Sequence, residues 1–101
     1  MGTTTKKELT NSISSALRLQ QTVVRDVIQA FLDACTAELA EGNRLEFRDF
    51  GVFETVERKP RRARNPRTGD AVAVPAKRAV KFKIGRLMKQ KLQEGLERAQ
   101  G

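Results

Sequence analysis

The chain has 101 residues, which suits one small domain. It carries 20 Lys and Arg against 12 Asp and Glu, for a net charge of +8, and it contains one cysteine and no histidine. These counts exclude an internal disulfide, a Ser–His triad and a structural zinc site. No apolar run approaches the roughly 20 residues of a membrane span, and the charged N-terminus lacks an apolar signal core, so we expect a chain that is neither exported nor membrane-bound.

The positive charge is concentrated in the second half of the chain. Residues 1–57 hold six basic and nine acidic residues, whereas residues 58–101 hold fourteen basic and three acidic residues, so the two parts carry −3 and +11. This asymmetry predicts a polyanionic partner. The alternative, a solvated surface with an excess of basic residues, leaves the steep asymmetry unexplained.

Two helices are predicted at the N-terminal end. Thr5 followed by Glu8 fits a capping box, and apolar residues at helical spacing indicate a helix over Lys6–Leu17. Residues 21–41 form a second helix with a wide apolar stripe, which ends before Gly42. A stripe this wide on so small a chain requires a large partner surface, so we predict a dimer.

Strands follow, and then a segment with little to bury. Residues 44–48 and 52–57 are predicted to pair across a tight turn at 49–51, and residues 77–83 form a third strand with its lysines on one face. The intervening segment, about 58–76, contains three prolines and six Lys or Arg among its first ten residues. We predict a projecting β-hairpin with its tip near Pro66, followed after the third strand by a basic helix over 86–99.

Candidate chemistry centres on this basic hairpin. Pro66 has a rigid apolar ring and no N–H, so it fits a wedge between base pairs, although it fits equally well as a residue that only shapes the turn. The backbone N–H groups near Gly85 and Arg86 are candidates for binding a phosphate. The acidic residues show no metal-ligand spacing, and Cys35 falls on the apolar stripe, so we expect no catalysis, no cofactor and no metal.

Three segments together resemble the HU and integration-host-factor family of bacterial nucleoid DNA-binding proteins. They are Phe50-Gly51-Val52-Phe53, Arg64-Asn65-Pro66-Arg67-Thr68-Gly69 and the run from Phe82 to Lys89. The resemblance spans essentially the whole chain, and its second segment is the most specific. It implies an α+β fold that forms an intertwined dimer: a helical base over 1–42, a three-stranded antiparallel sheet over 43–83 with its arm at about 58–76, and a C-terminal helix over 84–101.

The resemblance also implies how the chain meets double-stranded DNA. Two arms embrace the minor groove, and Pro66 inserts between base pairs and kinks the duplex. The residues that match the family's DNA-contacting positions are Arg58, Lys59, Arg61, Arg62, Arg64, Asn65, Pro66, Arg67, Thr68, Lys77, Arg78, Lys81, Lys83, Arg86 and, near the first helix's N-terminus, Lys6. Ala63 stands where the family often has glycine, and the chain continues past the family's usual end.

We therefore expect a homodimeric, non-enzymatic architectural protein of the bacterial cytoplasm and nucleoid that compacts DNA largely without sequence specificity. It should prefer bent, nicked or flexible DNA, and take no small-molecule ligand. An integration-host-factor-like subunit with sequence preference, paired with a paralogue, is one alternative. A basic RNA-binding protein is another, but this chain lacks the flat aromatic sheet and the GxxG loop that would support that class.

Overall fold

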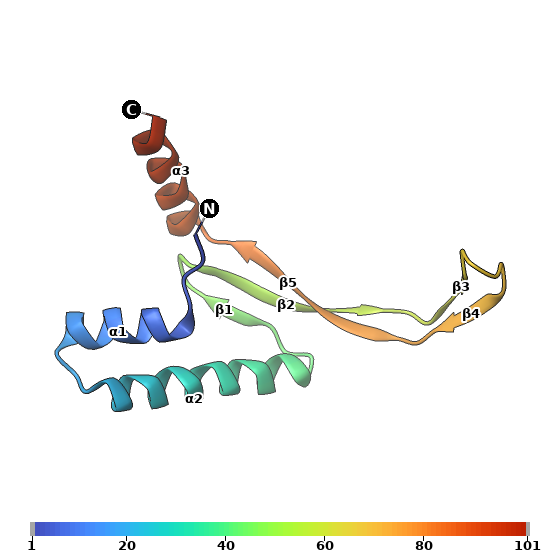
Figure 1. Ribbon diagram of the computed structural model, residues 1–101, viewed down its shortest axis with the longest axis horizontal. Helices are drawn as coiled ribbons and strands as arrows, with labels where there is room; N and C mark the ends of the chain where they lie inside the picture. Colours follow the sequence, from blue (N-terminus) through green and yellow to red (C-terminus); the bar gives the residue numbers. More distant parts are fainter. Residues whose placement is uncertain (1, 101) are drawn as a thin grey trace. The chain divides into compact units, whose positions relative to one another are not determined.

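The structure, a computed structural model, describes residues 2–100. Helices and antiparallel strands give the predicted α+β class. The chain divides after Ala37, within the second helix, into two compact units. In chain order the elements are α1 (Lys6–Leu17), α2 (Gln21–Ala40), β1 (Leu45–Phe47), β2 (Gly51–Arg58), β3 (Arg61–Arg64), β4 (Ala71–Val74), β5 (Lys77–Ile84) and α3 (Arg86–Gln100) (Figure 1).

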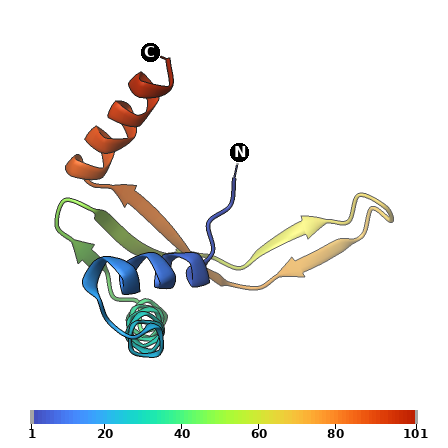
Figure 2. The same ribbon diagram turned by 60° about the vertical axis from the view of Figure 1, so that its left-hand side comes forward.

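The first unit is a helical hairpin of α1 and all but the last turn of α2 (Figure 2). The Thr5 hydroxyl oxygen accepts a hydrogen bond from the Glu8 backbone N–H at 3.3 Å, which confirms the predicted N-cap. α1 ends at Leu17 and is capped by Arg18, whose φ of 55° lies in the left-handed region. The Ser14 hydroxyl then donates to the Leu19 carbonyl and fixes the turn into α2.

The apolar stripe of α2 is only partly covered by its own chain. Val24 is buried at 4 % exposure, whereas Val27 and Phe31 are 62 % and 52 % exposed. In α1, Leu17 is also 62 % exposed. Large apolar side chains exposed together in this way are typical of a surface that contacts a partner.

The C-terminal end of α2 lies in the second unit and closes in a Schellman motif. Gly42 has a φ of 87°, and its N–H donates to the Leu39 carbonyl at 3.0 Å. The N–H of Asn43 donates to the Glu38 carbonyl at 3.0 Å. The predicted end before Gly42 is confirmed, with Ala40 as the last helical residue, one residue earlier than predicted.

The second unit contains a three-stranded antiparallel sheet with the order β1-β2-β5. β2 pairs with β5 over eight residues, from Gly51 opposite Ile84 to Arg58 opposite Lys77. The turn between β1 and β2 covers residues 48–50, so Gly51 begins the strand, whereas the sequence pattern predicts it as the end of the turn. Because side chains alternate along a strand, the β2–β5 register gives the sheet two faces: one carries Phe53 and Phe82, and the other carries Lys77, Lys81 and Lys83.

One face of the sheet carries a cluster of aromatic rings. The ring of Phe53 lies 6.0 Å from that of Phe47 and 4.7 Å from that of Phe82, and Phe50 lies 5.8 Å from Phe82. Gly51 packs directly on this cluster, because a Cβ placed there would lie 2.4 Å from the Phe82 ring. The cluster is only partly covered, since Phe50 and Phe82 are 48 % and 40 % exposed.

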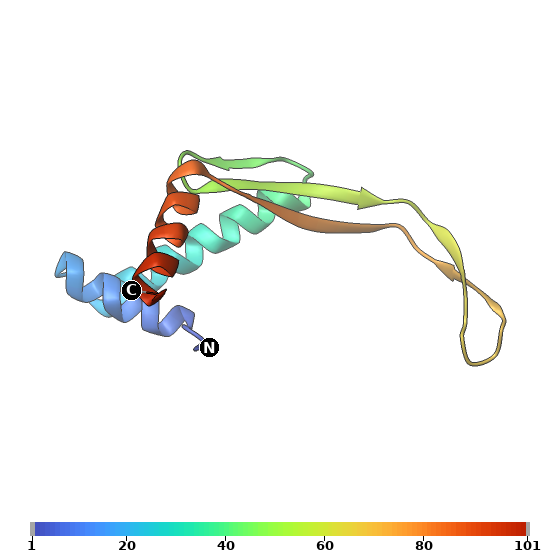
Figure 3. The ribbon, with the colours of Figure 1, turned by 90° about the horizontal axis from the view of Figure 1, so that it is seen from above.

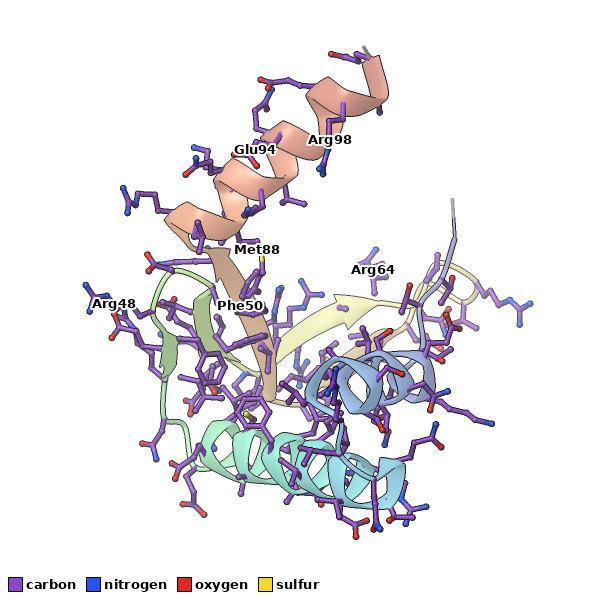
Figure 4. The ribbon with its side chains drawn as sticks, turned by 90° about the vertical axis from the view of Figure 1, so that its left-hand side faces the viewer. Arg48, Phe50, Arg64, Met88, Glu94 and Arg98 are labelled. Carbon is purple, nitrogen blue, oxygen red and sulfur yellow. The ribbon has the colours of Figure 1, made fainter. Side chains whose placement is uncertain are left out.

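The β1–β2 turn also fixes the start of α3. The Gly85 N–H donates to the Phe50 carbonyl at 2.8 Å, and the Met88 N–H donates to the Asp49 carbonyl at 3.2 Å. A Cβ on Gly85 would lie 2.8 Å from the Asp49 carbonyl carbon, so this close approach requires glycine. Figure 4 labels Phe50 and Met88 on the two sides of this junction.

Beyond the sheet, the chain forms the arm, residues 59–76, one residue shorter than the predicted 58–76 because Arg58 still pairs with Lys77 in the sheet. β3 pairs with β4 over four residues, beginning with Arg61 opposite Val74. Residues 59–60 and 75–76 belong to neither ladder, so the ribbon is interrupted on both strands at the same level. Figure 3 shows β3 and β4 continuing the ribbon of β2 and β5. The predicted hairpin is confirmed, whereas the sequence pattern does not predict its interruption.

Candidate nucleic-acid interface

The tip of the arm is a short loop closed by its own hydrogen bonds. The Asn65 N–H donates to the Asp70 carbonyl, and the Gly69 N–H donates back to the Asn65 carbonyl, both at 2.8 Å. The Asn65 side-chain oxygen accepts from the Arg67 N–H at 2.9 Å, and the Thr68 hydroxyl accepts from the Asp70 N–H at 3.3 Å. Gly69 supplies the left-handed residue, with a φ of 77°.

Pro66 lies in the exposed part of this loop, between Asn65 and Arg67. Proline has no N–H to donate, but the loop does not need one here, because the donors of its closing hydrogen bonds are Asn65, Gly69 and Arg67. Half-buried Asn65 turns its carbonyl oxygen into the loop, whereas the neighbouring Pro66, Arg67 and Thr68 are exposed. The loop can therefore present an apolar ring and a guanidinium together at its apex.

The arm has two different faces. The register places Arg62 opposite Ala73 and Arg64 opposite Ala71, so two arginines share one face with two small residues. Arg61 lies on the other face together with Ala63 and the two valines of β4. Figure 4 shows Arg64 projecting from β3. Arginines flanked by alanines are sterically free to reach a groove.

The sheet carries a second group of cations on a single face. Lys77, Lys81 and Lys83 alternate along β5, and Arg58 lies directly opposite Lys77. Glu54, directly opposite Lys81, forms an ion pair with Lys83 at 3.3 Å. The predicted separation of the lysines from the apolar face is confirmed. One of these lysines, however, is already paired with a carboxylate.

Two further arginines lie near this face, and the sequence pattern indicates neither of them. Arg44 lies 3.8 Å from the Glu54 carboxylate. Arg48 belongs to the β1–β2 turn and points outward in Figure 4, and it lines a shallow groove of about 630 Å³ together with Lys83. Both arginines precede the basic second half of the sequence, so the charge distribution along the chain carries no signal for them.

The remaining candidate residues occupy different settings. Lys59 is exposed in the interruption of the ribbon, and Arg86 is the exposed first residue of α3. The prediction that the backbone N–H of Gly85 binds a phosphate is wrong, because that N–H already donates to the Phe50 carbonyl. Arg78 lies on the opposite sheet face from the three lysines.

Lys6 belongs to the first unit. Its ammonium group contacts the side-chain oxygen of Gln29, which joins α1 to α2. The two residues line a groove of about 500 Å³ with the further cations Lys7 and Arg25. Lys6 is therefore partly occupied by a contact within its own unit.

Two other kinds of site receive no support from the part of the chain that the structure describes. Between residues 2 and 100, no group of three or more Asp, Glu or Cys residues is arranged to hold a metal ion. In the same range, no helix has the length and apolar character needed to cross a membrane.

Comparison with protein families gives one match over most of the chain. A family model described as "Bacterial DNA-binding protein" matches residues 4–93. The protein named "Probable DNA-binding protein HU" of Chlamydia trachomatis is 50 % identical over 91 residues, which cover 89 % of this chain and 91 % of that protein. The integration host factor subunit beta of Ralstonia nicotianae is 40 % identical over 97 residues, covering 93 % of this chain and 69 % of that protein.

Solved structures agree with these matches. An Anabaena HU–DNA cocrystal structure aligns with a TM-score of 0.78 and 29 % identity, covering 88 % of this chain and 97 % of that one. A point mutant of HU from Thermotoga maritima aligns with a TM-score of 0.65 and 24 % identity, covering 88 % of this chain and 99 % of that one, which supports the fold alone. α3 continues to Gln100, past the end of the family match at residue 93.

Proposed function

Because this chain belongs to the family of bacterial DNA-binding architectural proteins that includes HU and the integration host factor subunits, we propose that it kinks double-stranded DNA largely without regard to sequence. It acts on the nucleoid in the cytoplasm, where it compacts and organises the chromosome. The whole of residues 1–101 serves as one DNA-binding domain: the base over 1–42, the sheet over 43–83 and the helix over 84–101.

The observation that carries this proposal is the arm tip. The loop closes on itself through Asn65 and Gly69, so the exposed Pro66 ring can enter a base step without breaking a hydrogen bond of the protein. Unstacking a base step costs a few kcal/mol, which contacts along the rest of the arm offset. DNA that is already nicked or bent has met part of that cost, so it binds more tightly than intact DNA.

The two groups of cations supply the affinity. On the arm, Arg62 and Arg64 face the minor groove, where the negative potential is strongest in narrow segments. On the sheet, Lys77, Lys81 and Lys83 contact phosphates. Each phosphate neutralised releases counterions, so affinity falls steeply with salt. The remaining proposed contacts are Lys6, Arg58, Lys59, Arg61, Asn65, Arg67, Thr68 and Arg86.

The active form is an intertwined homodimer with two arms. The exposure of Val27 and Phe31 on α2 and of Leu92 and Leu96 on α3 supports this proposal, because a second copy would cover these side chains. Two arms on one dimer would place two wedges on one duplex, and each would add its own kink.

A second candidate is a sequence-preferring subunit of the integration-host-factor type, paired with a paralogue. The 40 % identity to the Ralstonia beta subunit over nearly the whole chain supports this second candidate. The two functions differ in one measurable property: a sequence-preferring subunit discriminates between intact duplexes, whereas an HU-like protein does not.

A competition titration at two salt concentrations tests the proposal. The competitors are a random duplex, the same duplex with a central nick, a duplex of unrelated sequence, and a double-stranded RNA of equal length. We expect tighter binding to the nicked DNA, a steep salt dependence, no preference between the two intact DNA duplexes and weak RNA binding. Equal affinity for intact and nicked DNA would remove the wedge, and preference for RNA would overturn DNA as the partner.

A further inference from the structure

Arg78 differs from the other cations of β5 in the face of the sheet that it occupies. Lys77, Lys81 and Lys83 are odd-numbered and share one face, whereas Arg78 is even-numbered and lies on the other. On its own face, Arg78 is directly opposite Glu57 and two residues from the Thr55–Val80 pair. A duplex bound to the lysine face would therefore meet the side of the sheet that Arg78 does not occupy.

The guanidinium of Arg78 is already engaged by the protein. Its Nε donates to the Glu57 carboxylate at 3.1 Å, and its Nη2 lies 3.0 Å from the same oxygen. Its Nη1 donates to the carbonyl of Ala40, the last residue of α2. Three of its nitrogens thus contact two acceptor residues, one on β2 and one on α2. A planar fork of this kind is well suited to holding two acceptors at once.

These contacts complete the end of α2. The last carbonyls of a helix have no partners inside the helix. The Schellman bonds satisfy Glu38 and Leu39, and the half-buried Thr55 hydroxyl also donates to the Leu39 carbonyl at 2.9 Å. Arg78 supplies a donor to Ala40 and places positive charge at the negative end of the helix dipole.

The contacts of Arg78 lie at the end of the β2–β5 ladder from which the arm leaves the sheet. The Glu57–Arg78 pair is the second-last pair of the β2–β5 ladder, and only Arg58–Lys77 separates it from the interrupted segments. These two pairs form the root of the arm. The ribbon loses its ladder bonds just beyond the root, so the direction in which the arm leaves the sheet depends on how firmly the root is held.

We propose that Arg78 is a positioning residue, which together with Thr55 and Glu57 fixes the root of the arm to the C-terminal end of α2 and makes no phosphate contact. This assignment replaces the saddle contact that the family resemblance implied for Arg78. It rests on the proposed function only in that the arm it positions is the part that grips DNA.

Arg78→Gln tests the proposal, with Lys77→Gln as the matched control from the adjacent position. Amide hydrogen exchange of the free protein reports on the root, and the slope of log affinity against log salt reports on phosphate contacts. For Arg78→Gln we expect roughly tenfold or more faster exchange at the root amides of β2 and β5, with an unchanged salt slope. For Lys77→Gln we expect wild-type exchange and a slope smaller by about 2, because each dimer loses two phosphate contacts.

Two results would overturn the assignment: a salt slope reduced by about 2 in Arg78→Gln, or unchanged exchange at the root. If Arg78→Gln does not fold, Thr55→Val removes the other tie to α2 without a change of charge. It must accelerate exchange in the same strands, and unchanged exchange would again refute the proposal. Absence of DNA binding by the wild-type protein would defeat the proposed function, whereas the exchange measurement would still test the root.

Discussion

Replacement of Pro66 by alanine removes the apolar ring at the arm tip and leaves the backbone and the neighbouring charges in place. It therefore measures what the ring alone contributes to DNA bending. The loop should survive this change, because its closing hydrogen bonds come from Asn65, Gly69, Arg67 and Thr68. The substitution removes two ring methylenes, each worth about 0.8 kcal/mol when buried, so a wedge buried between bases loses about 1.6 kcal/mol per arm.

This loss corresponds to about a 15-fold smaller ratio of kinked to straight complexes for each arm, since about 1.4 kcal/mol is tenfold. Energy transfer between dyes at the two ends of a duplex measures bending, and fluorescence anisotropy on the same duplex measures affinity. We expect bending to fall much more than affinity, because the phosphate contacts of the sheet and arm remain. On a nicked duplex the defect should shrink, because the base step is already open.

Pro60→Ala is the matched control, since it makes the same chemical change at an exposed position that belongs to neither ladder. It should leave bending near the wild-type value. Equal losses of bending and affinity in Pro66→Ala, or no loss of either, would refute the wedge. An equal bending defect in Pro60→Ala would show that the arm's stiffness, and not insertion at its tip, limits bending.

Three further variants test the same geometry. Charge reversal at Arg61 and Arg64 should weaken binding to every duplex by more than about tenfold at low salt, measured by anisotropy on two unrelated sequences; a loss confined to one sequence would indicate direct base readout. Glu54→Gln removes the carboxylate that pairs with Lys83 at 3.3 Å, so DNA binding should become tighter and more salt-dependent, and a titration series showing unchanged affinity would contradict that competition. Gly85→Ala forces a Cβ to within 2.8 Å of backbone and should destabilise the fold by about 1–3 kcal/mol in urea unfolding, whereas a loss below about 0.5 kcal/mol would show that the junction relaxes.

Much of the secondary structure could be predicted because its signals are local. The Thr5 cap, the Gly42 end and the turn residues around Pro66 act through their own backbone neighbours, and the structure shows each of them in the predicted role. Arg18 shows the limit of such signals. Nothing in its residue type predicts a left-handed φ, and the structure places it there as the end of α1.

The candidate site was harder to predict because it depends on register and on distant contacts. The family resemblance groups Arg78 with the lysines of its strand, although strand alternation alone separates it from them. Its contact with Ala40 joins residues 38 positions apart, which no local pattern indicates. Arg48 could not be predicted for a similar reason, since only the fold brings it beside Lys83. The occupied N–H of Gly85 likewise depends on a turn more than 30 residues earlier.

The interruption of the ribbon at Pro60 and Pro75 makes arm length an independently adjustable quantity. The ladder of β3 and β4 shares no hydrogen-bonded pair with that of β2 and β5, so residues added within the former leave the sheet register untouched. One residue added to each strand would move Arg62 and Arg64 to the side of the ribbon that the two valines now occupy. Two residues added to each strand would leave every side chain on its present side. Each such two-residue step would extend the arm by about 7 Å. Relatives or engineered forms could therefore grip longer or shorter stretches of duplex on an unchanged base.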